Sequence, residues 1–189
     1  MEEDLILIEH ALQGDDQAYA RLVDKYKNKL YTFILGMMGQ PEDAQDVAQE
    51  VFIKAYFHLR NYTGASKFWT WLYRIAYNQC MDEFRRRKRR GHSVDVEDIT
   101  IRDENTPESI LMEKEKLKRM HETILALPEM YRTVVLLKHT QELSCQQIGE
   151  ILEIPENTVR VRLHRARIKL RESMAVNEER GNEYELLDL

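Results

Sequence analysis

The segment LSCQQIGEILEIPENTVRVRLHRARIKL, residues 143–170, carries the signals for two helices separated by a tight turn. Ser144 is followed three positions later by Gln147, which is the pattern of a capping box, so we expect a helix to begin at Cys145. Ile154 and Pro155 end that helix, because proline cannot continue it, and proline suits the start of the next. The segment therefore predicts a helix-turn-helix unit.

Two further positions bear on how this unit is built. Gly149 leaves room for the second helix to cross closely. Many helix-turn-helix units have glycine in the turn, but here Glu153 or Ile154 occupies that place. We expect the turn to form without a residue that adopts left-handed backbone angles at low cost.

The second helix separates into faces when each residue is stepped by 100°. One narrow stripe should face the core and consists of Val159, Leu163, Ala166 and Leu170. The opposite side is made of Val161, His164, Arg165 and Ile168, with Arg160, Arg167 and Arg171 on one flank and Arg162 and Lys169 on the other. Two basic flanks around a central face suit the DNA major groove, where the flanks meet phosphates and the centre meets base edges. The alternative interpretation is a solvated basic helix, which would not require the capping box and turn upstream.

Composition predicts an all-α protein of one or two small domains. The chain has 189 residues, it contains few Gly and Pro, and about a third of its residues are charged. The net charge of −5 hides a segregation, because basic residues gather in Arg85–Arg90 and Arg160–Arg171. Local potential, and not the total charge, attracts phosphate.

The remaining composition signals argue against several classes. Cys80 and Cys145 lie far apart and have no metal-ligand spacing, so we expect no disulfide and a cytoplasmic chain. No apolar run is long enough to span a membrane, and the acidic start is unlike a signal peptide. No nucleophile, metal cluster or phosphate loop is visible, so we expect binding rather than catalysis, no cofactor and no metal.

The expected organisation is two small helical domains joined by a flexible linker, with the helix-turn-helix in the second. The first domain covers residues 1–90. Residues 91–106 form an acidic linker without apolar periodicity. The second domain covers residues 107–174, and residues 175–189 form an acidic tail that we expect to be disordered.

A helix expected over residues 42–60 has large apolar groups on both faces. Its core stripe is formed by Ala44, Val47, Ala48, Val51, Phe52, Ala55 and Leu59. Ile53, Tyr56 and Phe57 lie on the opposite, otherwise polar face, which indicates a protein-binding surface. The alternative is that a neighbouring helix of the same domain buries them.

A polar loop over residues 60–67 leads into a helix over residues 67–89 that ends in the first basic run. Aromatic residues on this helix alternate with polar and cationic ones. Such a pattern suits unpaired bases, because rings stack on them, amides read their edges and arginines hold phosphates. For Phe68 and Trp71 we favour an ordinary core position.

Five segments together resemble the extracytoplasmic-function class of bacterial RNA polymerase sigma factors. They are GDDQAYARLVDKY, DVAQEVFIKAY, FWTWLYRIAYN with its basic run, LPEMYRTVVLL and LSCQQIGEILEIPENTVRVRLHRAR, in the family's order. Departures are modest: Tyr19 stands where Phe is usual, and Asn157 where Gly often precedes Thr-Val. The acidic tail has no counterpart in the core pattern.

The resemblance implies three contact sets. The segment that docks on the clamp coiled coil of the polymerase largest subunit includes Asp46, Gln49, Glu50, Ile53, Tyr56 and Phe57. The set that opens and holds the −10 element comprises Asn61, Tyr62, Lys67, Trp69, Tyr73, Arg74, Tyr77, Asn78, Arg85 and Arg86. The set that reads the −35 element as duplex comprises Thr158, Arg160, Val161, Arg162, His164, Arg165 and Arg167.

The resemblance also implies partners: core RNA polymerase, promoter DNA and an anti-sigma factor. Two other classes compete with it. A stand-alone helix-turn-helix regulator would leave the first domain's aromatic helix and apolar face without a role. An enzyme acting on RNA or single strands would need a catalytic constellation that the sequence lacks.

Overall fold

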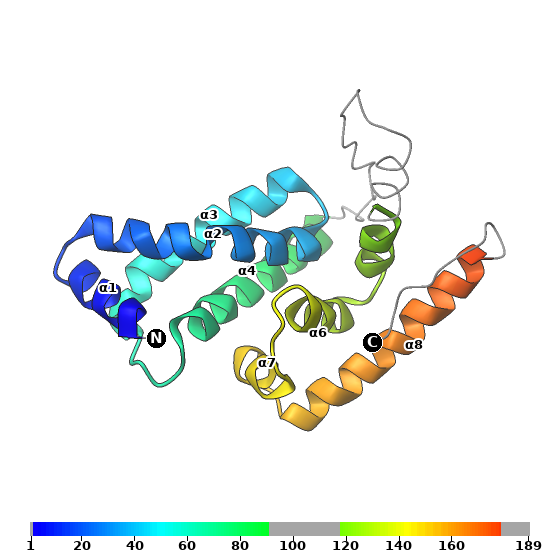
Figure 1. Cartoon of the computed structure of the whole chain (residues 1–189). Coiled ribbons are helices and arrows are strands. Elements are labelled where there is room, and N and C mark those ends of the chain that lie inside the picture. The colour runs from blue at the N-terminus through cyan, green and yellow to red at the C-terminus, as the bar shows by residue number, and fades with distance from the viewer. Residues whose placement is uncertain (1, 91–117, 179–189) are drawn as a thin grey trace, which may run out of the picture.

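The computed structural model describes residues 2–90 and 118–178, and every regular element within them is helical (Figure 1). The first half of the chain contains α1 (Glu2–Leu12), α2 (Asp16–Met38), α3 (Pro41–His58), a 3₁₀ turn (Leu59–Asn61) and α4 (Phe68–Arg90). The second half contains a helical stretch over residues 118–125, then α6 (Glu129–His139), α7 (Cys145–Leu152) and α8 (Glu156–Glu178). The expected all-α class with two helical regions is confirmed.

Some expectations concern residues that the structure does not describe. The linker over residues 91–106 and most of the tail lie outside the described residues. The helix α8 continues to Glu178, four residues beyond the domain end that the sequence suggested.

The core of the first half is built around α2, which packs against α1, α3 and α4. The helix begins after Asp15, whose carboxylate accepts hydrogen bonds from the backbone N–H groups of Gln17 and Ala18 at 2.9 and 3.2 Å. It ends at Gly39, whose φ of 84° is the left-handed angle that glycine adopts readily. Its central apolar residues are fully buried: Leu30, Phe33, Ile34 and Met37.

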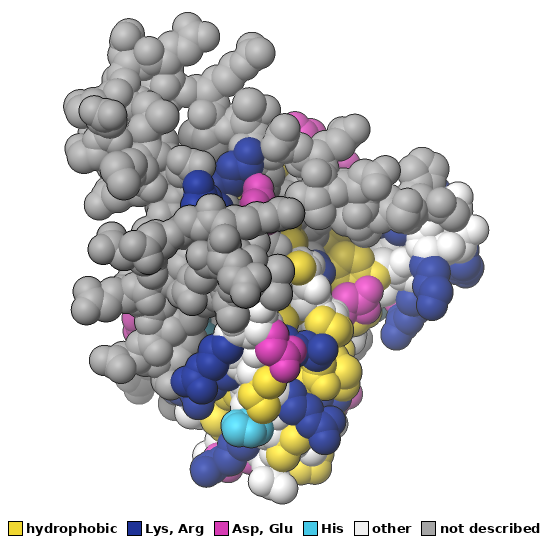
Figure 2. All heavy atoms as spheres, turned by 90° about the vertical axis from the view of Figure 1, so that its right-hand side faces the viewer, with side chains coloured by type: hydrophobic (Ala, Val, Ile, Leu, Met, Phe, Trp, Pro, Cys, Tyr) yellow, Lys and Arg dark blue, Asp and Glu magenta, His cyan; other side chains and the backbone are white. Residues whose placement is uncertain are grey.

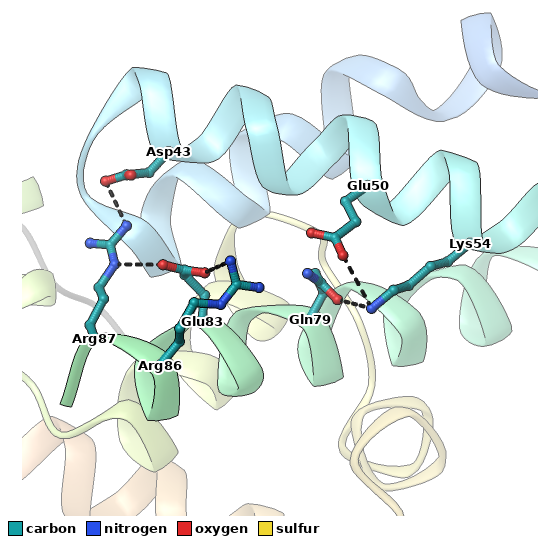
Figure 3. A network of polar contacts seen from close by, with 7 residues as sticks. All are labelled: Asp43, Glu50, Lys54, Gln79, Glu83, Arg86 and Arg87. Carbon is teal, nitrogen blue, oxygen red and sulfur yellow. Dashed lines mark hydrogen bonds and ion pairs between the residues drawn. The ribbon is translucent and has the colours of Figure 1, made fainter. Parts of the chain in front are cut away.

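Polar contacts hold α3 against α4 at two places (Figure 3). Arg87 pairs with Asp43 of α3 at 2.7 Å and with Glu83 of its own helix at 3.3 Å. Lys54 of α3 pairs with Glu50 at 3.5 Å and donates to the buried Gln79 of α4. Arg87, one of the arginines of the basic run, is therefore ion-paired within the first half.

The helix-turn-helix in the second half has the expected construction. Ser144 and Gln147 form both hydrogen bonds of the capping box. Glu153 takes the left-handed position of the turn, with φ 55° and ψ 41°. A Cβ at Gly149 would lie 2.8 Å from the carbonyl oxygen of Ile154, so the glycine makes room for the turn itself.

The two halves contact each other, which the sequence did not predict. A Cβ atom placed at Gly36 of α2 would lie 2.6 Å from Leu136 of the second half, and one placed at Gly39, directly after α2, would lie 3.0 Å from Leu125. Arg132 of α6 donates hydrogen bonds to the carbonyl oxygens of Met37 at 2.6 Å, of Leu127 at 3.1 Å and of Leu125. The helices α4 and α7 also pack together. The described residues therefore form one closed assembly.

The described residues contain neither a helix suited to cross a membrane nor a cluster of metal ligands. None of the helices there has the length and apolar character needed to cross a membrane. Nor do His, Cys, Asp or Glu side chains in that part of the chain gather into a group that could hold a metal ion.

Candidate functional site

The outer face of α3 exposes large apolar side chains. Ile53 is 56% exposed and Phe57 is 75% exposed. The ring of Tyr56 lies 4.9 Å from that of Tyr19, and its hydroxyl donates to Asp16 at 3.1 Å. The alternative that a neighbouring helix buries this face is not what the structure shows. Asp46 and Gln49 are exposed beside it, and Glu50 is half-buried.

The segment that joins α3 to α4 is compact. Asn61 belongs to the 3₁₀ turn and is exposed, as is Lys67. The hydroxyl of Tyr62 donates to the carbonyl oxygen of Ser66 at 2.6 Å, which ties the two ends of the loop together. Phe68 is buried, as expected, whereas Trp71 is only half-buried.

On α4 the structure separates the expected base-contacting residues into two groups. Asn78 is exposed, and Trp69 and Tyr77 are half-buried. Tyr73 is 3% exposed, so it does not lie on the surface where we expected it. Its hydroxyl donates to Gln141 of the second half at 2.6 Å, and burial raises the pKa of this hydroxyl.

Arg74, next to Tyr73, is also held by the second half. It pairs with Glu153 at 3.0 Å and donates to the carbonyl oxygen of Glu150 at 2.7 Å. The helix-turn-helix therefore covers part of the α4 face that the sequence assigned to unpaired bases. Further along α4, Arg85 pairs with Asp82 at exposed positions, and the exposed Arg86 pairs with the half-buried Glu83.

The faces of α8 lie as the 100° stepping predicted. Val159, Leu163, Ala166 and Leu170 are all buried, which confirms the core stripe. Val161, His164, Arg165 and Ile168 are exposed on the opposite side. Figure 2 shows this side of the molecule, with basic side chains interleaved with hydrophobic ones.

The residues on the flanks of α8 differ in whether they are ion-paired and in how exposed they are. Arg160 forms a double contact with Glu156 at 2.6 and 3.1 Å, and this contact raises the pKa of the arginine. Arg162, Arg167 and Thr158 are half-buried. An exposed ion pair of this kind is weak, so a phosphate would compete with Glu156 readily.

Sequence reasoning missed the residues that join the halves. Gln141 donates to the carbonyl oxygen of Lys29 at 3.3 Å in addition to accepting from Tyr73. The guanidinium of Arg132 lies 5.9 Å from the ring centre of Phe84. These partners are separated by tens of positions, so no spacing in the sequence could have revealed them.

Taken together, the described residues define a DNA-binding protein of two helical parts, one with a helix-turn-helix and one with an aromatic and basic helix beside an exposed apolar face. Residues 22–90 match the family model described as Sigma-70 region 2, and residues 117–170 match that of Sigma-70, region 4.

Similar proteins of known function agree with these matches. The chain is 39% identical over 176 residues to the ECF RNA polymerase sigma factor SigW of Bacillus subtilis, covering 88% of this chain and 94% of the relative. It is 35% identical over 173 residues to the ECF RNA polymerase sigma-E factor of Escherichia coli strain K12, covering 87% and 90%. The chain belongs to the extracytoplasmic-function class of RNA polymerase sigma factors, in the sigma-70 family.

Two solved structures share the fold. One is CnrH in complex with the cytosolic domain of CnrY, with a TM-score of 0.71, 23% identity and coverage of 93% of this chain and 99% of that one. The other is the sigma factor RpoE in complex with the anti-sigma factor NepR from Bartonella quintana, with a TM-score of 0.69, 19% identity and coverage of 84% and 98%.

Membership confirms the expected function. A sigma factor is a non-enzymatic subunit of RNA polymerase that binds the core enzyme and directs transcription initiation at promoters. A stand-alone regulator is not supported, because the first half of the chain matches region 2.

Proposed function

We propose that the outer face of α3 is the surface that docks on the clamp coiled coil of the polymerase largest subunit. The observation that carries this proposal is the exposure of Ile53, Tyr56 and Phe57, with the polar Asp46, Gln49 and Glu50 beside them. Apolar groups surrounded by polar ones are the usual composition of a protein interface.

The experiment replaces Ile53 and Phe57 together with Glu. Gel filtration with core RNA polymerase should show that the unaltered chain comigrates and the double variant does not. Because both side chains are exposed, helicity and cooperative unfolding should change little. A matched control is Gln45→Glu, on an exposed position of the same helix, which should still comigrate. Loss of cooperative unfolding in the double variant would place these side chains in the core and end the proposal.

We propose further that the loop over residues 61–67 and the outer part of α4 hold the unpaired bases of the −10 element. Asn61, Tyr62, Lys67, Trp69, Tyr77 and Asn78 would contact the strand, and Arg85 and Arg86 its phosphates. Stacking on an aromatic ring contributes about 1–3 kcal/mol per base. The exposed Asn78 and the half-buried rings of Trp69 and Tyr77 support this assignment.

Tyr73 and Arg74 require a movement before they could take part. Both are bound by residues of the second half in the described arrangement. The −10 and −35 elements lie roughly two helical turns apart, at about 34 Å per turn. We infer that the closed arrangement is the state before promoter binding, and that the halves separate when the −10 and −35 elements are bound together.

The groove-facing side of α8 is proposed to read the −35 element as duplex. Val161, His164 and Arg165 would meet base edges, and Thr158, Arg160, Arg162 and Arg167 would meet phosphates or serve both. The proposal is supported by the exposure of the first three and by the burial of the opposite stripe.

The remaining partner is an anti-sigma factor. In the two solved structures described above, CnrH is bound to the cytosolic domain of CnrY and RpoE is bound to the anti-sigma factor NepR. We propose that this chain too is held by such a factor in the cytoplasm. Copurification of the chain at its natural expression level, followed by mass spectrometry, tests this.

A further inference from the structure

The first helix of the chain lies outside the stretch that matches Sigma-70 region 2, which begins at residue 22. Even so, α1 packs against α2 and against the 3₁₀ turn that opens the loop over residues 61–67. Figure 1 shows α1 beside the loop that joins α3 to α4. The position of α1 allows it to influence that loop.

Glu3 and Asp4 both attach α1 to α2 through Lys25, and Asp4 is the buried member of the two. It is 7% exposed, and carboxylates are seldom buried to this extent unless they are paired. One of its oxygens accepts a hydrogen bond from Lys25 at 2.7 Å, and the other accepts one from the hydroxyl of Tyr26 at 2.6 Å. A buried carboxylate whose oxygens are both bonded in this way fixes the groups that donate to it.

Tyr26 connects this carboxylate to a cluster of rings under the loop. Its ring centre lies 5.6 Å from that of Phe68, the first residue of α4. Phe68 in turn lies 5.7 Å from Tyr62, edge to face, and 5.7 Å from Trp71. Tyr62 and Trp71 are 5.6 Å apart, which closes the cluster. We call Tyr26, Tyr62, Phe68 and Trp71 the aromatic cluster.

Tyr62 belongs to both the cluster and the loop. Its hydroxyl donates to the carbonyl oxygen of Ser66, so the placement of its ring also determines how the loop closes. The contacts therefore run without interruption from Asp4 to Tyr26, to Phe68, to Tyr62 and to the loop backbone.

We propose that Asp4 and Tyr26 are positioning residues for the loop over residues 61–67, and that α1 thereby determines how well the loop holds the single-stranded −10 element. This rests on the proposed function of the loop. Neither residue touches the DNA in this proposal. Each acts by fixing the aromatic cluster, and so the angle at which Tyr62 and its neighbours meet the strand.

The first experiment tests the contacts without DNA. The chain has two tryptophans, so in a Trp69→Phe background the fluorescence reports Trp71 alone. Tyr26→Phe removes only the hydroxyl that bonds to Asp4, and it should shift the Trp71 emission to longer wavelength and increase quenching by acrylamide. The matched control is Asp24→Asn, which breaks the exposed 2.7 Å pair with Lys27 on the same helix and should change neither. Unchanged emission and quenching in Tyr26→Phe would overturn the proposal.

The second experiment measures the consequence in the holoenzyme. The probe is a single-stranded DNA selected from a random pool by the unaltered holoenzyme. Asp4→Ala and Tyr26→Phe should each weaken its binding, by up to about tenfold, since Tyr26→Phe removes one hydrogen bond to the buried carboxylate and Asp4→Ala removes the carboxylate itself. The double variant should bind the probe about as well as whichever single variant binds it more weakly, because both substitutions remove the hydrogen bond between Tyr26 and Asp4. Affinity for core polymerase and for −35 duplex should stay unchanged.

Two outcomes would count against the proposal: equal binding of the probe by all variants, or a loss that extends to core polymerase. Asp4→Asn gives a further check. Its amide oxygen can still accept from Tyr26, but its NH2 group then faces the Lys25 ammonium, so it should restore part of the binding lost in Asp4→Ala. Failure of the proposed function looks different. The unaltered holoenzyme would then select no sequence from the pool, while the Trp71 signal would still respond to Tyr26→Phe.

Discussion

Arg165 and Arg162 lie on one helix but are expected to contact different parts of DNA. Arg165 is exposed at the centre of the groove-facing side, and Arg162 is half-buried on a flank. An arginine that bonds a guanine edge contributes about 1–3 kcal/mol of discrimination, so Arg165→Ala should relax the preference at one or two positions of the −35 element. A binding-site selection with the variant holoenzyme measures this.

Arg162→Ala is the matched variant for the phosphate contact. It should weaken binding to all sequences alike and make the log–log salt dependence shallower by about one unit. A salt titration provides the slope. If instead Arg165→Ala changes only the slope and leaves the selected sequence intact, the base-reading side of α8 must be sought among its flanks.

We expect His121 to make the second half sensitive to acid. Its Nε2 is buried and bonds to none of the described residues. Burial, aided by the charge of Arg132, lowers the pKa of His121 below its ordinary value of 6.5. The folded state therefore favours the neutral ring. Its contribution to stability is complete above that ordinary value and is lost as pH falls, because the unfolded chain takes up the proton first.

We expect the melting temperature to decrease as the pH is lowered from about 7.5 to about 5.5, and to decrease less in His121→Gln. His164→Gln, at an exposed position of α8, is the control and should follow the unaltered chain. Equal falls in all three proteins would show that other groups cause the pH dependence.

At the scale of an element, the turn between α7 and α8 depends on Gly149. A Cβ there would meet the Ile154 carbonyl oxygen at 2.8 Å, and backbone yields less easily than a side chain. Gly149→Ala should destabilise the chain by about 1–3 kcal/mol, the usual cost of overfilling a packed site. Chemical denaturation measures this, with Gln146→Ala on the exposed side of α7 as control. A neutral effect would mean that the turn has room to shift.

Features that follow from helical geometry could be predicted from the sequence, whereas contacts between helices could not. The capping box and the buried stripe of α8 follow from fixed helical geometry, so spacing alone predicted both. The exposed face of α3 followed for the same reason. Asp4 looked like part of an acidic start and turned out buried, because its partners Lys25 and Tyr26 come from another helix.

At the scale of the whole molecule, the sequence indicated two domains but not how they contact. Tyr73 has the same spacing whether its hydroxyl meets a base or Gln141, which lies 68 positions away. Only the folded arrangement decides between the two. Helical periodicity therefore could not predict that Tyr73 is buried.

The closed arrangement itself is open to test through Arg74 and Glu153. Glu153→Arg places two cations together and should favour separation of the halves by up to about fivefold, because a pair that is partly exposed contributes up to about 1 kcal/mol. The double exchange Arg74→Glu, Glu153→Arg restores opposite charges and should restore closure. Small-angle X-ray scattering of the free chain measures the radius of gyration.

The control for this exchange is Glu172→Arg, which makes the same charge change at an exposed position of α8. It should leave the radius of gyration as it is in the unaltered chain. A double exchange that stays as extended as Glu153→Arg alone would show that this pair does not hold the halves together.

Arg132 of the second half caps the end of α2 in the first by bonding the carbonyl oxygen of Met37. Because both partners belong to one chain, this contact forms at an effective concentration that is roughly millimolar and does not change with the amount of protein. A ligand for the covered face of α4 must compete with that fixed local concentration, however dilute the protein is. A short stretch of promoter DNA would compete poorly on its own. Core polymerase, by binding both halves at once and holding them apart, would remove the competitor and leave the face available.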